Sequence, residues 1–180
     1  MDWVALTIGA DSVFPQWISS DRRSVQRGSE DNRRMQPNPR LQALALLIGE
    51  WTTVGAHPML PGKTFHGSAT FTWLQSGAFL LCQTHIDEPE IPDGVAILGT
   101  DDATPDAGAM LYFDVRNVSR EYRWTISDNV WTWSRDEPGF SQRMVLTIAD
   151  DGQSIEARGQ MWRNSQPWEP DLQTTYSRVS

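Results

Sequence analysis

From Gly49 to the C-terminus, hydrophobic residues alternate with polar ones, and short turn signals interrupt the alternation at nearly regular intervals. A period of two is typical of a β-strand with one buried face. The pattern predicts ten consecutive strands, at 49–57, 64–75, 78–87, 93–101, 108–115, 118–127, 130–137, 140–149, 153–163 and 168–179. Short connections between consecutive strands predict an all-β, antiparallel, up-and-down sheet. Closure of this sheet into a barrel would remove its exposed edges.

Turn residues fix the register of each hairpin, and the register decides which face points inward. The turn at 128–129 places Trp124 opposite Trp133, and the turn at 138–139 places Trp133 opposite Met144. The turn at 151–152 continues this inner face, and the turn at 116–117 adds Phe113 opposite Arg120 and Leu111 opposite Tyr122. Agreement among four independent turns is strong evidence for one inner face. A fifth turn, at 76–77, predicts an inward row of Phe71, Trp73, Leu80 and Cys82.

Two segments precede the strands. Asn38 and Pro39 have the residue types of a helix N-cap and first helical position, and apolar residues at helical spacing then lead to Gly49. This predicts a short amphipathic helix that plugs one end of the barrel. Residues 1–37 differ in composition: Trp3, Phe14 and Trp17 stand with an Arg-rich polar stretch. Either a partly disordered tail or a lid over the barrel mouth fits this extension, and the barrel domain covers 38–180.

The composition of the chain narrows the range of functions that it can have. The chain of 180 residues has nine tryptophans, a net charge of -8 and a single lysine, Lys63, in the predicted barrel. Such an acidic domain is a poor binder of nucleic acids or anionic membranes, and no apolar run is long enough to span a bilayer. Cys82 is the only cysteine, so it forms no internal disulfide. Without a recognisable signal peptide, we expect a cytoplasmic protein, either a monomer or a homodimer.

The start and end of the predicted barrel carry a family resemblance. The helix leading into Gly49-Glu50-Trp51 resembles the Gly-X-Trp signature of the calycin superfamily, in which a basic residue of the last strand packs across the tryptophan. Arg178 stands in the corresponding place. Residues 41–180 are similar to a group of uncharacterised bacterial lipocalin-like proteins, most clearly in Tyr112-Phe113-Asp114 and at 138–143. The resemblance implies a lipocalin-like barrel.

Nitrobindin, a more distant relative in this superfamily, is a haem-binding barrel, so the resemblance raises the question of whether this chain binds haem. Its haem is bound by a histidine near the C-terminus, whereas the histidines here are His57, His66 and His85. The resemblance therefore implies no haem in this chain, and we expect no cofactor. Fatty-acid-binding proteins, another related group, bind a ligand carboxylate through an Arg-X-Tyr arrangement, which Arg120-Glu121-Tyr122 resembles although it stands on a different strand.

Polar side chains stand among the aromatic residues of the predicted inner face. Arg120, Tyr122, Arg135 and Gln142 lie near one end, with Glu137 at the rim. A guanidinium in an apolar barrel needs an anionic partner, which is either Glu137 or an acidic group of a ligand. The tryptophans are either core packing or the wall of a cavity. The predicted ligand-binding residues are Phe71, Trp73, Phe113, Arg120, Tyr122, Trp124, Trp131, Trp133, Arg135, Phe140, Gln142, Met144, Met161 and Tyr176.

Two functions fit this inner face. The first is binding of a small, largely apolar molecule that is aromatic or carboxylated. The second is a cofactor-independent cyclase or isomerase, in secondary metabolism for example, with Arg120, Tyr122 and Arg135 stabilising negative charge. His57 is either a general base or a histidine of the rim. His66 and His85 are expected outside the barrel, where they lack further metal ligands, so we expect no metal site.

Overall fold

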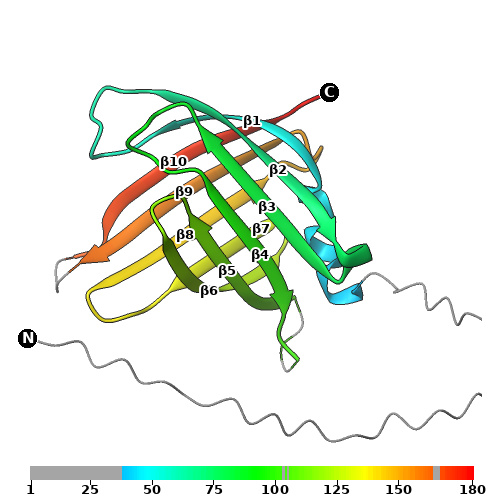
Figure 1. Cartoon of the computed structure of the whole chain (residues 1–180). Coiled ribbons are helices and arrows are strands. Elements are labelled where there is room, and N and C mark those ends of the chain that lie inside the picture. The colour runs from blue at the N-terminus through cyan, green and yellow to red at the C-terminus, as the bar shows by residue number, and fades with distance from the viewer. Residues whose placement is uncertain (1–37, 103, 105, 164–166) are drawn as a thin grey trace, which may run out of the picture. The chain divides into compact units, whose positions relative to one another are not determined.

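The computed structural model describes residues 38–102, 104, 106–163 and 167–180, and the predictions for 1–37 lie outside these residues. Ten strands form a closed antiparallel barrel in which each strand pairs with its neighbours in the sequence and β1 pairs with β10 (Figure 1). A helix, η1 (Pro39–Leu47), precedes the barrel. The strands are β1 (Gly49–Ala56), β2 (Phe65–Leu74), β3 (Phe79–Ile86), β4 (Gly94–Thr100), β5 (Ala107–Asp114), β6 (Val118–Ser127), β7 (Val130–Arg135), β8 (Phe140–Ile148), β9 (Ser154–Arg163) and β10 (Glu169–Arg178). The predicted fold class is confirmed.

The register expected from three of the turns is confirmed. Trp124 pairs with Trp133, Trp133 with Met144, and Met144 with Gly159. The row around the turn at 75–77 also has its expected partners, because Phe71 pairs with Cys82. These hairpins place one continuous apolar face inside the barrel.

The register of the β5–β6 hairpin differs from the prediction by one residue. Arg120 pairs with Tyr112, not with Phe113, and Tyr122 pairs with Met110. The connection contains three residues, 115–117, in which Asn117 adopts a positive φ of 64°. The added residue exchanges the two faces of β5. Phe113 and Leu111 are consequently on the outer surface, 43% and 45% exposed, so their predicted inward positions are wrong.

The plug helix is a 3₁₀-helix that closes one end of the barrel. Leu41, Leu44 and Leu47 recur at every third residue and are fully buried. With three residues per turn, this spacing places all of them on one side of the helix. Trp51 donates from Nε1 to the Leu47 carbonyl at 2.8 Å, and the Arg178 guanidinium lies 4.1 Å from the centre of a Trp51 ring. The contact that the family resemblance implied is therefore present.

The two ends of the barrel differ. Loops β1–β2, β3–β4, β5–β6 and β7–β8 lie at the end away from η1, since successive connections of an antiparallel barrel alternate between its ends (Figure 1). The helix occupies the other end. Within the described part of the chain, no helix has the length and apolar character needed to cross a membrane.

Candidate functional site

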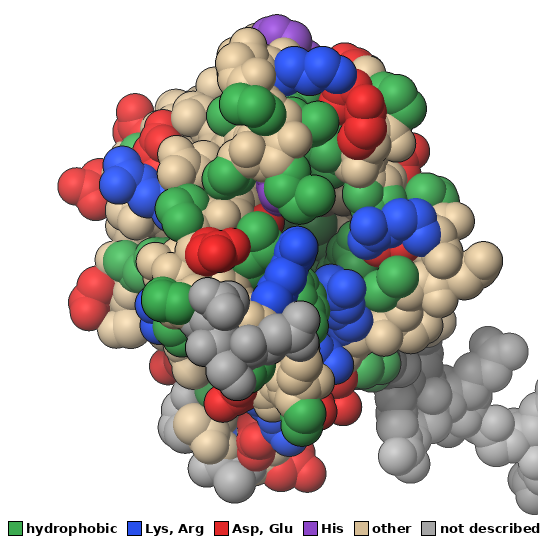
Figure 2. All heavy atoms as spheres, turned by 90° about the vertical axis from the view of Figure 1, so that its left-hand side faces the viewer, with side chains coloured by type: hydrophobic (Ala, Val, Ile, Leu, Met, Phe, Trp, Pro, Cys, Tyr) green, Lys and Arg blue, Asp and Glu red, His purple; other side chains and the backbone are tan. Residues whose placement is uncertain are grey.

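A cavity of about 690 Å³ lies inside the barrel and extends to the end away from η1. Its wall is rich in aromatic side chains from strands around the barrel: Phe71, Tyr112, Tyr122, Trp131, Trp133, Phe140 and Tyr176. Seen from this end, the molecule has a hollow with several lysine or arginine side chains beside it (Figure 2). The volume lies within the range of pockets that hold small molecules.

Most of the residues predicted to bind a ligand line this cavity. They are Phe71, Arg120, Tyr122, Trp131, Trp133, Phe140, Gln142, Met144, Met161 and Tyr176, and His57 joins them from the end of β1. The prediction missed Tyr112, because the shifted register of β5 exchanged it with Phe113.

Four of the predicted residues lie elsewhere. Trp124 is buried among the core residues and donates from Nε1 to the Gly99 carbonyl at 3.0 Å. Trp73 packs against the same core. The Arg135 Nη1 group donates to the Phe140 carbonyl at 2.6 Å and the side chain is not part of the cavity wall. Phe113 is on the outer surface.

Arg120 contributes a positive charge to the cavity wall, which Arg116 and Arg163 also line. Its guanidinium lies 4.6 Å from the centre of the Phe140 ring. Among the described residues, neither Arg120 nor Arg135 forms an ion pair with Glu137. Burial raises the pKa of Tyr122, and the neighbouring Arg120 guanidinium acts in the opposite direction. Arg120 therefore provides a positive charge at the cavity without a carboxylate partner in this part of the chain.

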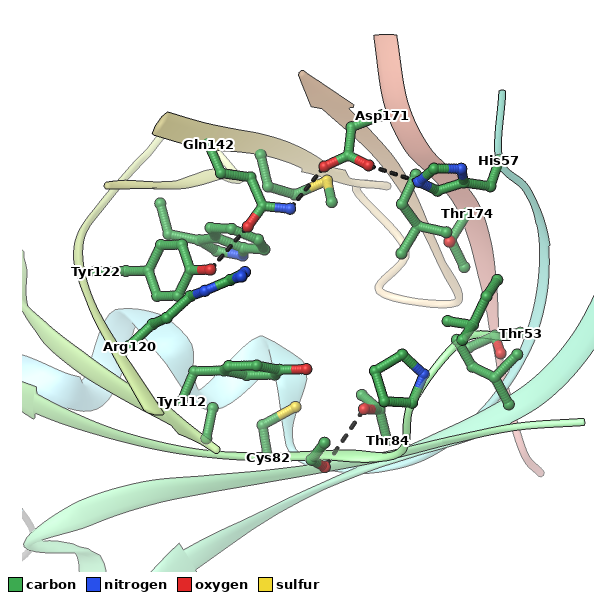
Figure 3. Close-up of a pocket in the computed structure, with 18 of the residues that line it drawn as sticks. Thr53, His57, Cys82, Thr84, Tyr112, Arg120, Tyr122, Gln142, Asp171 and Thr174 are labelled. Carbon is green, nitrogen blue, oxygen red and sulfur yellow. Dashed lines mark hydrogen bonds and ion pairs between the residues drawn. The ribbon is translucent and has the colours of Figure 1, made fainter. Parts of the chain in front are cut away.

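Four polar side chains form a hydrogen-bonded chain along the wall (Figure 3). The Tyr122 hydroxyl donates to Gln142 Oε1 at 2.7 Å, and Gln142 Nε2 donates to Asp171 Oδ2 at 2.6 Å. The other Asp171 oxygen lies 2.8 Å from His57 Nε2. His57 Nδ1 accepts from the Met59 backbone N–H at 3.0 Å. The network connects β6, β8 and β10 with the residue that follows β1.

Strict alternation along β10 did not predict the inward position of Asp171. The pairing of β10 with β9 shifts between Pro170 and Gln173, so two residues of β10 stand opposite one residue of β9. Both Asp171 and Leu172 contact the cavity as a result. At the position opposite, Gly159 leaves room for the irregular backbone, because a Cβ there would lie 2.8 Å from the Leu172 carbonyl oxygen.

Two buried polar atoms of the wall have no hydrogen-bond partner among the described residues. These are the Trp131 Nε1 donor and the Thr174 hydroxyl oxygen. Buried polar groups of folded proteins are nearly always paired, so unpaired ones in a cavity wall favour a polar ligand or bound water.

The other side chains considered for catalysis or metal binding have little support from the structure. Cys82 lines the cavity, but burial raises the pKa of its thiol to about 12, which disfavours the nucleophilic thiolate. His66 and His85 are exposed on the outside, as expected. Within the described ranges, no group of three or more His, Cys, Asp or Glu side chains is arranged to hold a metal ion.

Comparisons with known proteins support the fold. No protein-family model matches the sequence, and no curated protein does. The crystal structure of Rv2717c from M. tuberculosis matches with a TM-score of 0.63 and 16% identity, over 81% of this chain and all of that one. The S-type phycobiliprotein lyase CPES from Guillardia theta matches with a TM-score of 0.53 and 10% identity, over 75% and 89%. At these identities the likeness shows the fold alone, a closed antiparallel β-barrel.

Proposed function

We propose that the protein binds one small, flat and largely apolar molecule inside the barrel. The observation that carries this proposal is the cavity itself, about 690 Å³ of space with an aromatic wall and a few unpaired polar groups. Aromatic side chains contribute large apolar contact areas and stack on flat ligands. The phycobiliprotein lyase with a similar fold supports small-molecule binding in a general way.

The position of Arg120 supports the proposal that the ligand carries an acidic group. Its guanidinium is in the cavity wall, and no described carboxylate forms an ion pair with it. Arginine presents several N–H donors in a plane and binds carboxylates well. The aromatic carboxylates are thus the ligand class that we propose.

A titration of tryptophan fluorescence tests the proposal. Trp131 and Trp133 are in the cavity wall, so 2-naphthoate should change their emission in a saturable way. Trp133→Ala should weaken this response while the far-UV circular dichroism of the barrel persists. Absence of a response to any naphthalene probe would refute a ligand cavity.

A cofactor-independent cyclase or isomerase is the second candidate. One observation favours it: the Asp171 carboxylate faces the cavity together with Arg120, which pairs a general base with a group that stabilises negative charge. His57 is a weaker base candidate than expected, because both of its ring nitrogens are hydrogen-bonded. Mass spectrometry that detects chemical conversion of a bound compound distinguishes this activity from binding.

We infer in addition that the chain is related to the bacterial lipocalin-like proteins that it resembles. The contact between Arg178 and Trp51 supports this relationship. A cytoplasmic location, and the choice between monomer and homodimer, stay predictions of the sequence.

A further inference from the structure

We propose that Asp171 forms a second polar subsite, which binds a protonated amine or another N–H donor of the ligand. This inference rests on the proposed ligand-binding function and makes the ligand class more specific. The ligand would be an aromatic molecule with an acidic group near Arg120 and a basic nitrogen near Asp171.

The first argument is the burial of a carboxylate without a cation. The Asp171 side chain is only 7% exposed, and it lines the cavity. Among the described residues, its hydrogen-bond partners are the Gln142 amide and the His57 ring, and neither lysine nor arginine forms an ion pair with it. Burial of an ionised carboxylate costs free energy unless a cation or several donors compensate for it.

The second argument is the proton of His57. A backbone N–H can only donate, so the bond from Met59 requires a lone pair on His57 Nδ1. The ring proton is then on Nε2, which donates to Asp171. This is the neutral tautomer of histidine, so in this arrangement His57 supplies Asp171 with a hydrogen bond and with no positive charge.

The third argument is the remaining capacity of the carboxylate. Two carboxylate oxygens offer about four acceptor sites, and one donor bonds each oxygen here. Thr174, on the same strand, also lines the cavity, and its hydroxyl has no partner among the described residues. Figure 3 shows Thr174 on the side of the cavity where Asp171 and His57 lie. An ammonium group with three N–H donors fits such a pair of acceptors.

The network also holds the two charges in fixed places. Tyr122 lies beside Arg120 (Figure 3), and its hydroxyl bonds Gln142, which in turn bonds Asp171. Arg120 and Asp171 form no ion pair with each other within the described structure. Each charged group is consequently left for a complementary group of the ligand, at neighbouring points of one wall.

Matched probes test the subsite. Binding of 2-naphthylmethylamine, protonated at neutral pH, is compared with binding of 2-ethylnaphthalene, its uncharged analogue, by fluorescence titration at 0.15 M salt. A hydrogen-bonded charge pair in the cavity should make the amine bind about 10- to 100-fold more tightly. This comparison uses the unmodified protein, so it does not depend on the folding of a variant.

Two variants locate the effect. Asp171→Asn should remove the preference for the amine while binding of 2-naphthoate persists. Glu90→Gln is the matched control, because Glu90 lies at the cavity and is half exposed, so it removes an equal charge without touching the network. Equal binding of amine and uncharged analogue, or a preference that survives Asp171→Asn, would overturn the subsite. If no naphthalene probe binds, the proposed function itself fails; if 2-naphthoate binds without any preference for the amine, only this inference fails.

Discussion

Replacement of Arg120 by Met should lower the affinity for an acidic ligand while the stability of the fold changes little. The Arg120 guanidinium lies over Phe140 and forms no ion pair with a described carboxylate. A hydrogen bond to a charged group contributes about 1.5–3 kcal/mol, so loss of the guanidinium should weaken binding of 2-naphthoate about 10- to 100-fold. Binding of the neutral 2-naphthamide should change much less. Since Met retains most of the apolar stem, the free energy of unfolding should change by no more than about 1 kcal/mol.

Isothermal titration calorimetry with both probes measures the affinities, and urea unfolding measures the stability. Arg135→Met is the matched control, because Arg135 bonds the Phe140 carbonyl and is not part of the cavity wall. This control should leave the preference for the carboxylate unchanged. An Arg120→Met variant that prefers 2-naphthoate as strongly as the unmodified protein would refute the assignment of Arg120 to an acidic group.

Three further predictions concern the framework of the cavity. Arg178 donates to the carbonyls of residues 46, 48 and 152 at 2.6, 2.6 and 2.7 Å. Arg178→Met should therefore lower the free energy of unfolding by about 2–4 kcal/mol, with Arg178→Lys intermediate; a loss below about 1 kcal/mol in urea unfolding would contradict this clamp. The neighbouring Arg116 lowers the pKa of Asp114 to about 2 from an ordinary 3.8. A depressed folded-state pKa stabilises the protein above the unfolded-state value, so Asp114→Asn should cost about 1–2 kcal/mol at pH 7. That difference should fade as the pH falls from about 4 towards 2, and a difference that is the same at both ends of this range would argue against the pair. Finally, the pKa of Cys82 is raised from 9.0 to about 12. At pH 8 the thiolate population is then about 1000-fold lower, and iodoacetamide should alkylate the native thiol correspondingly more slowly than in urea; comparable rates would show an accessible thiolate.

The turns of the sequence were sufficient to predict the barrel and most of its inner face. Two-residue turns such as Asp128-Asn129 have one preferred pairing, so the inward positions of Trp131 and Trp133 followed directly. The turn at 115–117 was ambiguous in length. Arg116-Asn117 has the residue types of a two-residue turn, yet the hairpin uses three residues, and one added residue exchanged Tyr112 for Phe113 in the wall.

The parts of the site that the sequence did not predict depend on departures from regular strands. Asp171 faces inward because of the bulge in β10, and a bulge has no simple periodic signal. Arg135 belongs to the inward alternation but is the last residue of β7, so its side chain reaches the Phe140 carbonyl across the turn. The alternative partners of Arg120 could not be distinguished by pattern alone, because an ion pair depends on side-chain positions at the rim.

Native mass spectrometry with a cavity-filling variant tests the central claim most directly. Ala96 is a buried residue of the cavity wall, and Ala96→Trp would fill part of the space. Ile97→Trp is the control, since the next residue of β4 points to the other face. We predict one molecule of 2-naphthoate per chain on the unmodified protein and on Ile97→Trp, and none on Ala96→Trp. Equal binding to all three proteins, or binding to none of them, would contradict a ligand site inside the barrel.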